Sequence, residues 1–373
     1  MTNAGLRLLR AVWPLLSLAL VVIAIAMIAS VAPITGQRRV AEAFVTLVAV
    51  VGLYIFVGNS GFVSFGNVSF MAIGAYVSAI LTMRPAAKAV FLPGLPELIK
   101  SAQWSAVPAA LAGGCVAAVL AFLVGIPLMR LSGIAASIAT FALLSITRIG
   151  IGNWDSVTGG QNSLMGFPIY TTVWIGLAWA LLAMATAFFY QETRSGLILR
   201  ATREDEVAAR AVGSNIHRHR MIAFVISAFF SAIAGVLLGH YLGVVRIETF
   251  YLDLTFNIVA ILVIGGTGSL AGAVFGTIAI STMAELLRHV EIGFQIGDLH
   301  ISAPAGLADV VVALGMLLII LFRPKGITNG REMPWPFHSG KSVTTGNPAH
   351  SNANGTQVFA GSDLVSEQRP SPQ

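Results

Sequence analysis

The sequence has very little charge and almost no cysteine. Only 10% of its 373 residues are Asp, Glu, Lys or Arg, and 56% are hydrophobic, whereas a soluble domain carries about 25% charged residues. Cys115 is the single cysteine, which excludes an intrachain disulfide and a cysteine metal site. The sequence contains no Ser/His/Asp set, no metal-ligand spacing and no paired acids at catalytic spacing, so we expect neither an enzyme nor a metal site. The composition instead indicates a polytopic membrane protein.

A complete phosphate-binding loop is also lacking. Residues 339–342 (Ser-Gly-Lys-Ser) resemble the end of such a loop, but the full motif needs a glycine where Trp335 stands, and Pro334 and Pro336 interrupt the turn. We therefore expect no ATPase in this chain. The net charge of +6 comes mostly from residues in loops, where a membrane protein carries its basic residues, so it does not indicate a nucleic-acid partner.

Apolar segments of near-spanning length recur along the chain. We expect an all-α fold of about ten transmembrane or partly re-entrant helices, centred on residues 14–34, 40–57, 66–83, 105–128, 131–149, 172–190, 221–245, 250–264, 268–287 and 303–322. Residues 1–330 would form this membrane domain. The rest, residues 331–373, is rich in Pro, Ser, Asn and Gly, which predicts a disordered cytoplasmic tail.

One segment carries an unusual density of charge. Residues 194–220, called the charged segment below, hold six arginines and three consecutive acids inside an expected loop of residues 191–220. Loops this basic stay on the cytoplasmic face, and the span count then places both termini there as well. Five basic residues fall on the outer side and depart from this rule: Arg38, Arg39, Arg84, Lys88 and Lys100.

The charged segment also predicts a short capped helix. Thr202 is expected as its N-cap, with Asp205 at the third position, so that the three acids lie at the positive end of the helix dipole. Glu206 and Arg210 are four residues apart in the favourable order, and Gly213 suits a left-handed stop. Such a helix indicates a docking site for a partner. We expect it to consist of Thr202, Arg203, Glu204, Asp205, Glu206, Ala208, Ala209 and Gly213.

Two glycine-rich stretches interrupt apolar segments. The first, residues 58–76, brings polar side chains into the membrane at Asn59, Ser64, Asn67 and Ser69. The second, residues 265–276, has glycines at spacing four that predict a small-residue face on one helix. For both stretches, tight helix packing and the lining of a solute path remain open. The candidates for the path are Gly58, Gly61, Ser64, Gly66, Asn67, Gly265, Gly266, Gly268 and Ser269.

Asn257 lies in the middle of an apolar segment and is a further candidate for the path. A structural hydrogen bond between helices is the alternative. The ionisable residues of the expected spans lie within them or at their ends: Glu42, Arg148, Asp253, Glu285 and Asp309.

These features, in this order, resemble the membrane permeases of bacterial branched-chain amino acid ABC transporters, and in particular their LivM-type subunit. The likeness covers roughly residues 15–330. Asn67 stands where the family commonly has His, and Val207 stands where the coupling loop of ABC importers has a characteristic Glu. The matching positions are Gly58, Gly61, Ser64, Gly66, Phe70, Gly74, Ala75 and Tyr76; Thr158, Gly159 and Gly160; Arg200, Arg203, Glu204, Asp205, Glu206, Ala208, Ala209 and Gly213; and Gly265, Gly266, Gly268, Ser269 and Gly272.

The resemblance implies a permease subunit in the bacterial inner membrane. Its partners would be a second permease subunit, two cytoplasmic ATPase subunits that use the ATP, and a periplasmic protein that delivers a branched-chain amino acid. The chain itself would bind no cofactor. Two alternatives stay open: the same class of permease carrying urea, short amides or aromatic acids, and an ion-coupled secondary transporter. The second alternative would need ionisable coupling groups deep in the membrane.

Overall fold

The computed structural model describes residues 3–292, 294–296, 299–301, 306–322, 326–328, 330 and 332. The chain divides into two units, residues 1–335 and 336–373, and every described residue belongs to the first. Except for Glu332, the predicted tail of residues 331–373 therefore lies outside the described residues.

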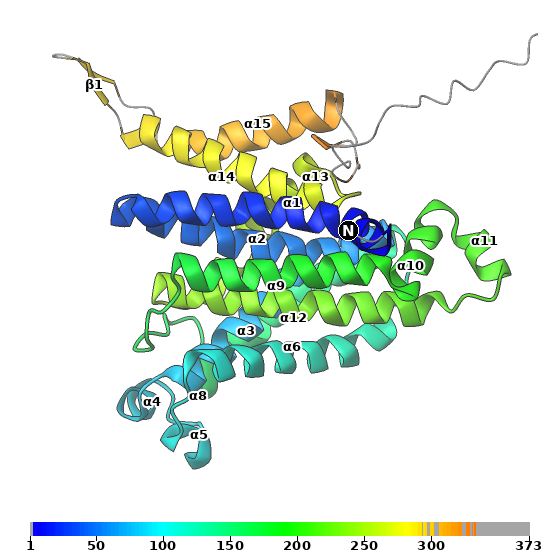
Figure 1. Ribbon diagram of the computed structural model, residues 1–373. Helices are drawn as coiled ribbons and strands as arrows, with labels where there is room; N and C mark the ends of the chain where they lie inside the picture. Colours follow the sequence, from blue (N-terminus) through cyan, green and yellow to red (C-terminus); the bar gives the residue numbers. More distant parts are fainter. Residues whose placement is uncertain are drawn as a thin grey trace, which may run out of the picture. The chain divides into compact units, whose positions relative to one another are not determined.

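Each of the ten predicted apolar segments contains a helix, and eight helical segments are long and apolar enough to cross a membrane. The all-α membrane fold is thus confirmed. A short hairpin of β1 (Phe294–Ile296) and β2 (Leu299–Ile301) accompanies the helices. The ten helices (Figure 1) are α1 (Asn3–Val31), α2 (Ile34–Ser60), α3 (Asn67–Thr82), α6 (Ala106–Leu128), α7 (Ile134–Gly152), α9 (Val173–Glu192), α12 (Ile216–Leu242), α13 (Leu252–Gly265), α14 (Leu270–Ile292) and α15 (Leu307–Phe322).

Helix α12 is the centre of the packing, since it contacts α2, α3 and α6 along much of its length. Glycines allow α3 and α12 to approach closely. A Cβ added at Gly235 of α12 would lie 1.9 Å from the carbonyl oxygen of Met71, and one added at Gly74 of α3 would lie 2.3 Å from that of Ala232. Small residues at crossing points are a usual means of helix packing in membranes, where the hydrophobic effect does not draw helices together.

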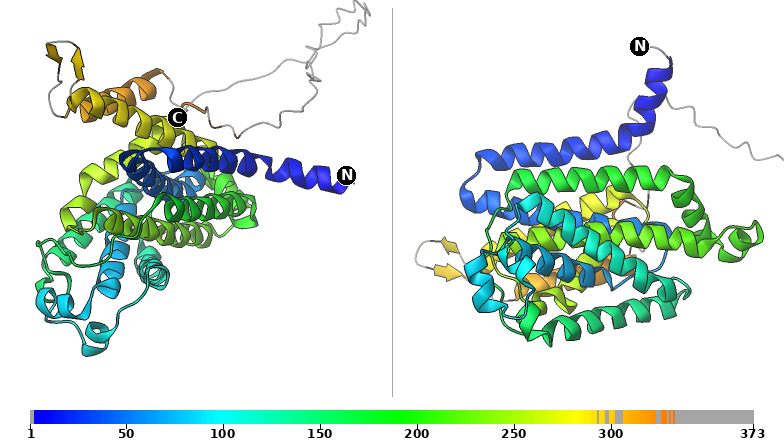
Figure 2. Two further views of the ribbon diagram at one scale, coloured as in Figure 1. Left: turned by 60° about the vertical axis from the view of Figure 1, so that its left-hand side comes forward. Right: turned by 90° about the horizontal axis from the view of Figure 1, so that it is seen from below.

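The short helices lie at the two ends of this bundle (Figures 1 and 2). Helices α10 (Arg194–Glu204) and α11 (Glu206–Ala211) lie at the same end as the start of α1. Helices α4 (Pro85–Phe91), α5 (Glu97–Ser101) and α8 (Asp155–Thr158) lie at the opposite end. The amino terminus and the charged segment therefore share one end of the bundle, as the predicted topology requires.

Two of the basic residues at the opposite end are matched by partners inside the fold. The ammonium of Lys88 is buried and donates hydrogen bonds to the carbonyl oxygens of Ile99, at 2.8 Å, and Ala102. Arg39 forms an ion pair with Glu285 of α14. These contacts hold both side chains within the fold, but Arg39 and Lys88 stay exceptions to the distribution of basic residues, because that distribution does not depend on pairing with acids.

The predicted small-residue face on one helix is confirmed only for Gly272 and Gly276, which lie on α14 and pack against α13; Gly265, Gly266 and Gly268 lie outside that helix. Gly266, with φ of 115°, ends α13, and Gly272 and Gly276 lie on α14 across the turn. A Cβ added at Gly265 would lie 2.0 Å from the carbonyl oxygen of Gly272. The positive φ lets the chain reverse here, so these glycines join two helices at a tight turn.

Candidate functional site

The charged segment folds as two helices that meet at Asp205. The prediction that Thr202 caps the short helix is wrong, because Thr202 lies inside α10 and its hydroxyl donates to the carbonyl oxygen of Leu199 at 2.6 Å. Asp205 is the cap instead: its Oδ1 accepts from the backbone N–H groups of Val207 and Ala208, at 2.8 and 3.0 Å. Asp205 is extended and breaks the helix, which lets its short carboxylate reach back to the next turn.

The positions of the three acids relative to the helix dipole also differ from the prediction. Glu204 is the last residue of α10, so it does not lie at the positive end of the short helix as predicted; only Asp205 and Glu206 do. Arg210 lies in the last turn of α11, as predicted. Gly213 follows with φ of 79°, which confirms the left-handed stop.

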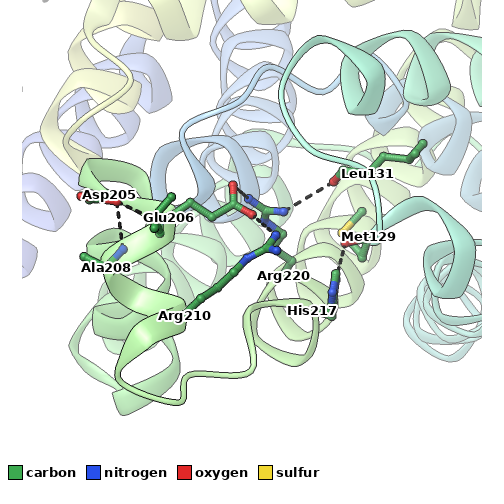
Figure 3. A network of polar contacts seen from close by, with 9 residues as sticks. Met129, Leu131, Asp205, Glu206, Ala208, Arg210, His217 and Arg220 are labelled. Carbon is green, nitrogen blue, oxygen red and sulfur yellow. Dashed lines mark hydrogen bonds and ion pairs between the residues drawn. The ribbon is translucent and has the colours of Figure 1, made fainter. Parts of the chain in front are cut away.

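Glu206 holds α11 against the rest of the bundle (Figure 3). Its carboxylate accepts hydrogen bonds from Arg210 at 2.6 Å and from Arg220 at 3.0 Å. Arg220, at the start of α12, is buried and also donates to the carbonyl oxygen of Leu131 at 3.5 Å. Its guanidinium lies over the ring of Phe62, 5.5 Å from the centroid. One buried arginine thus connects α11, α12, the α6–α7 turn and the segment after α2.

The pKa of the Glu206 carboxyl is lowered from its ordinary value. Burial acts to raise this pKa, but the hydrogen bond from Arg210 and the charge of Arg220 outweigh burial. The ionised form is therefore the stable form of Glu206 at neutral pH, and the ion pairs persist there.

Two arginines of α10 bind the end of α2 that lies nearest to the charged segment. Arg203 donates from Nη1 to the carbonyl oxygen of Gly58 at 3.0 Å. Arg200 donates from Nε to Asn59 Oδ1 at 2.9 Å, and from Nη2 to Gln191 Oε1 at 2.7 Å and Tyr54 Oη at 3.1 Å. Cations at the carboxyl end of a helix also interact favourably with its dipole. Arg200 belongs to the sequence motif of the charged segment, but the sequence alone assigns it no role.

After α2 the chain runs as non-helical backbone from residue 61 to residue 66. Gly61, with φ of 81°, ends α2, and a Cβ there would lie 2.6 Å from Cγ of Arg203. Two hydroxyls of α7 bind this broken backbone: Ser137 donates to the carbonyl oxygen of Val63 at 2.7 Å, and Thr140 accepts from the N–H of Phe65 at 3.2 Å. Broken backbone inside a membrane protein needs such partners. No local sequence pattern indicates that Ser137 and Thr140 supply them.

The polar side chains of this stretch are buried and bound to one another. Ser64 donates to Asn67 Oδ1 at 3.2 Å, and the amide of Asn67 donates to Ser227 at 2.8 Å and Ser231 at 3.1 Å, both on α12. Asn67 is only 4% exposed. In this conformation the amide therefore joins α3 to α12. An added Cβ at Gly66, just before α3, would lie 3.1 Å from the carbonyl oxygen of Thr140, so this glycine contacts α7 closely.

The turn between α13 and α14 is covered by residues that follow α15. Ser269 caps α14 through its Oγ, which accepts from the N–H of Gly272 at 3.0 Å. Glu332 accepts from the N–H of Leu270 at 2.8 Å, so the carboxylate neutralises the positive end of α14. Thr328 donates from its N–H to the carbonyl oxygen of Gly265 at 3.2 Å. Ordered contacts thus extend to Glu332, beyond the predicted domain boundary at residue 330.

The two glycine-rich stretches meet at this end of the bundle. A Cβ at Gly58 would lie 3.0 Å from the carbonyl oxygen of Thr267, in the α13–α14 turn. One at Gly268 would lie 4.0 Å from Nη1 of Arg203, the atom that binds the Gly58 carbonyl. The charged segment, the end of α2 and the α13–α14 turn therefore form one junction, called the arginine junction below. That these stretches border a solute path stays a prediction.

Asn257 differs from Ser64 and Asn67 in its surroundings. Its side chain is exposed on α13, and among the described residues no hydrogen bond joins it to either of them. Its neighbour Phe256, 52% exposed, is paired with Phe65 of the broken stretch, with ring centroids 6.1 Å apart. Phe65 also pairs with Phe141 of α7, at 6.4 Å. Phe65 thus joins the broken stretch to Phe141 of α7 and Phe256 of α13, and these three rings are called the aromatic surface below.

Comparison with known proteins identifies the class of molecule that carries this arrangement. A family profile described as branched-chain amino acid transport system / permease component matches residues 38–321. The high-affinity branched-chain amino acid transport system permease protein LivM of Escherichia coli (strain K12) is 27% identical over 310 residues, or 74% of this chain, and that of Salmonella typhimurium (strain LT2) is 28% identical over the same length. The corresponding protein BraD of Pseudomonas aeruginosa is 31% identical over 47% of this chain. The matches span 66%, 66% and 53% of these relatives, less than two thirds in each case.

Proposed function

The chain belongs to the family of branched-chain amino acid transport permeases, and we propose that it is a membrane subunit of an ATP-driven importer for branched-chain amino acids. The names of the relatives LivM and BraD support this cargo class. In the proposed assembly, a periplasmic binding protein delivers the amino acid, and a second permease subunit completes the membrane part. Two ATPase subunits bind on the cytoplasmic side and use the ATP, so this chain itself holds no cofactor.

The proposed orientation places both termini and the charged segment on the cytoplasmic side of a bacterial inner membrane. The supporting observation is the concentration of arginines at the end of the bundle where α1 begins. Transfer of several guanidinium groups across lipid during insertion is costly, so this end stays inside.

The ATPase subunits are proposed to dock on α11. Val207 is 78% exposed and Val212 is 81% exposed. Both lie outside the membrane-spanning helices, so lipid does not account for their exposure. Apolar side chains that protrude into water from a short, well-capped helix are typical of an interaction surface. The ion pairs of Glu206 and the buried Arg220 keep this helix fixed to the bundle, so a force on α11 reaches α12 directly.

The single observation that carries the coupling proposal is the contact between Arg203 and Gly58. Helix α10 follows α9 and leads into α11, and two of its arginines, Arg200 and Arg203, bind the end of α2 where the first broken stretch begins. Displacement of α10 and α11 by the ATPase cycle would therefore move α2 and the adjoining α13–α14 turn. Alternating access in the membrane would follow from this movement of broken helices.

The solute path is proposed to run along the aromatic surface between α7 and α13. An exposed amide such as that of Asn257, within the span of residues 247–265, is costly against lipid. It is better placed opposite the second permease subunit, with the path between the two. Phe65 and Phe256 would contact the apolar side chain of the amino acid, and backbone groups near the broken helices would meet its charged ends.

A cysteine cross-linking experiment tests the docking surface. The native cysteine is first removed as Cys115→Ala, and Val207→Cys is introduced in that background. We expect a cross-link from residue 207 to the ATPase subunit when the complex is assembled in membranes. Val90→Cys is the matched control, because Val90 is 76% exposed but lies on α4 at the opposite end. Equal cross-linking from both positions, or none from residue 207, would refute docking on α11.

A further inference from the structure

A groove of about 730 Å³ lies where the end of α6 meets the start of α12, on the end of the bundle that carries the charged segment. Its lining has two parts, an apolar wall and a basic rim. Phe122 and Ile126 of α6, with Met221 and Ile222 of α12, form an apolar wall. The rim is polar and mainly basic, and it consists of Arg130, Arg210, Asn215, His217 and Arg218.

The rim carries positive charge that the fold leaves unmatched. Arg210 is paired with Glu206, but among the described residues no acid pairs with Arg130 or Arg218, and both side chains are exposed. The imidazole of His217 is fixed to α6 by a hydrogen bond of 2.9 Å between Nδ1 and the carbonyl oxygen of Met129 (Figure 3). The start of α12 adds the positive end of a helix dipole. The rim therefore suits an anion.

The apolar wall, unlike Arg130 of the rim, lies within the membrane-spanning helices. Phe122, Ile126 and Ile222 are 52%, 46% and 43% exposed, and all three belong to helices long enough to span the membrane. Arg130 stands two residues beyond the end of α6, at Leu128. With these helices spanning a membrane, the groove would cross the boundary between hydrocarbon and water. An occupant that fits both parts must combine an acyl chain with an anionic head group.

We propose that this groove binds an anionic glycerophospholipid, with its phosphate between Arg130 and Arg218 and an acyl chain along Phe122, Ile126 and Ile222. An acidic segment of a partner protein would match the rim, but it would leave the apolar wall without a matching surface. A bound lipid would fix the α6–α12 contact beside Arg210 and the charged segment. Activity of the importer would then depend on the anionic lipid content of the membrane.

Native mass spectrometry of the full chain, released from membranes of defined composition, tests the proposal. The probes are phosphatidylglycerol and phosphatidylcholine with identical acyl chains, mixed in equal amounts. We expect the native chain to retain phosphatidylglycerol preferentially. The variant Arg130→Gln/Arg218→Gln should lower this preference about 30-fold, since each basic residue near an anionic membrane contributes about 1 kcal/mol. The charge-conserving variant Arg130→Lys/Arg218→Lys should keep most of the preference.

The control variant Arg84→Gln/Arg194→Gln removes the same charge from exposed positions outside the groove and should behave as the native chain. Retention of phosphatidylglycerol by the Arg130→Gln/Arg218→Gln variant at the native level would overturn the proposal. So would equal competition by glycerol phosphate, because that molecule has no acyl chain. Loss of ATPase binding in this variant with unchanged lipid retention would assign the groove to a protein contact instead.

Discussion

Arg203 donates a hydrogen bond of 3.0 Å to the carbonyl oxygen of Gly58, across 145 residues of sequence. The first residue belongs to the charged segment and the second to the last turn of α2. Because non-helical backbone follows three residues later, this bond joins the proposed docking end to the start of the broken stretch.

Replacement of Arg203 by Ala should therefore uncouple transport from ATP hydrolysis. A hydrogen bond to a charged group contributes about 1.5–3 kcal/mol, so amino acid uptake should fall at least about tenfold. Hydrolysis by the docked ATPase subunits should continue. Both rates are measured in the same proteoliposomes. Arg194→Ala is the control, because Arg194 is exposed at the start of α10. Equal uptake by the two variants would show that the Arg203 contact is not used.

A second prediction concerns the crossing of α3 and α12. Gly235→Ala should destabilise the protein by about 1–3 kcal/mol or more, because the added methyl group would lie 1.9 Å from the Met71 carbonyl oxygen. Gly150→Ala on α7 meets nothing within 4 Å and should be neutral or slightly stabilising. Thermal unfolding in detergent measures the difference. Equal unfolding temperatures would mean that the two helices do not pack this closely.

The ion pairs of Glu206 predict a defined response to pH. Since the folded-state pKa of Glu206 is lowered, its contribution to stability is complete above the usual value, about 4.3, and disappears as the pH falls through the lowered value. Between pH 6 and pH 8, protection of α11 from hydrogen exchange should not depend on this group. Glu206→Gln should reduce that protection at neutral pH by about 1–3 kcal/mol, because Arg220 stays buried without its anion.

Glu204→Gln is the matched control for Glu206→Gln. Glu204 is exposed and, among the described residues, no ion pair holds its carboxylate, so the substitution should leave protection of α11 unchanged. If both variants exchange at the same rate, Glu206 does not anchor α11.

The aromatic surface predicts an effect on affinity for the amino acid. Phe256→Ala should raise the KM for leucine uptake by up to about tenfold, because full burial of a phenylalanine side chain contributes about 1.5–3 kcal/mol and about half of this one is free to contact the amino acid. Phe189→Ala on α9 is the control, since Phe189 is 58% exposed on a different helix. Initial uptake rates over a range of leucine concentrations give both values. An unchanged KM in Phe256→Ala would place the path elsewhere.

The long elements could be predicted because their signals are local and strong. All ten apolar segments contain helices, since each must satisfy its backbone within the segment. The short charged helix was placed with less success. Thr202 and Asp205 both suit an N-cap, and only the extended backbone at Asp205 decides between them. That conformation depends on how α10 and α11 pack, which local sequence does not specify.

The candidate site was recovered in part for a similar reason. Gly58 and Gly268 could be singled out by type, and the structure brings their segments together at the arginine junction. The hydroxyl partners could not be predicted, namely Ser137, Thr140 and Ser227. A hydroxyl in an apolar helix does not indicate which backbone group, far away in the sequence, it will bind. Asn257 and Asn67 are both predicted to lie near the solute path, and this stays a prediction; Asn67 is buried on α3, whereas Asn257 is exposed on α13.

Leucine uptake into proteoliposomes that hold the permease with its ATPase and binding-protein partners tests directly whether import is driven by ATP. We expect uptake that requires ATP on the side of α11 and continues after proton and sodium gradients are collapsed. Uptake should stop when the ATPase subunits are omitted. Leucine uptake by this chain without ATPase subunits, driven by an ion gradient, would contradict ATP-driven import.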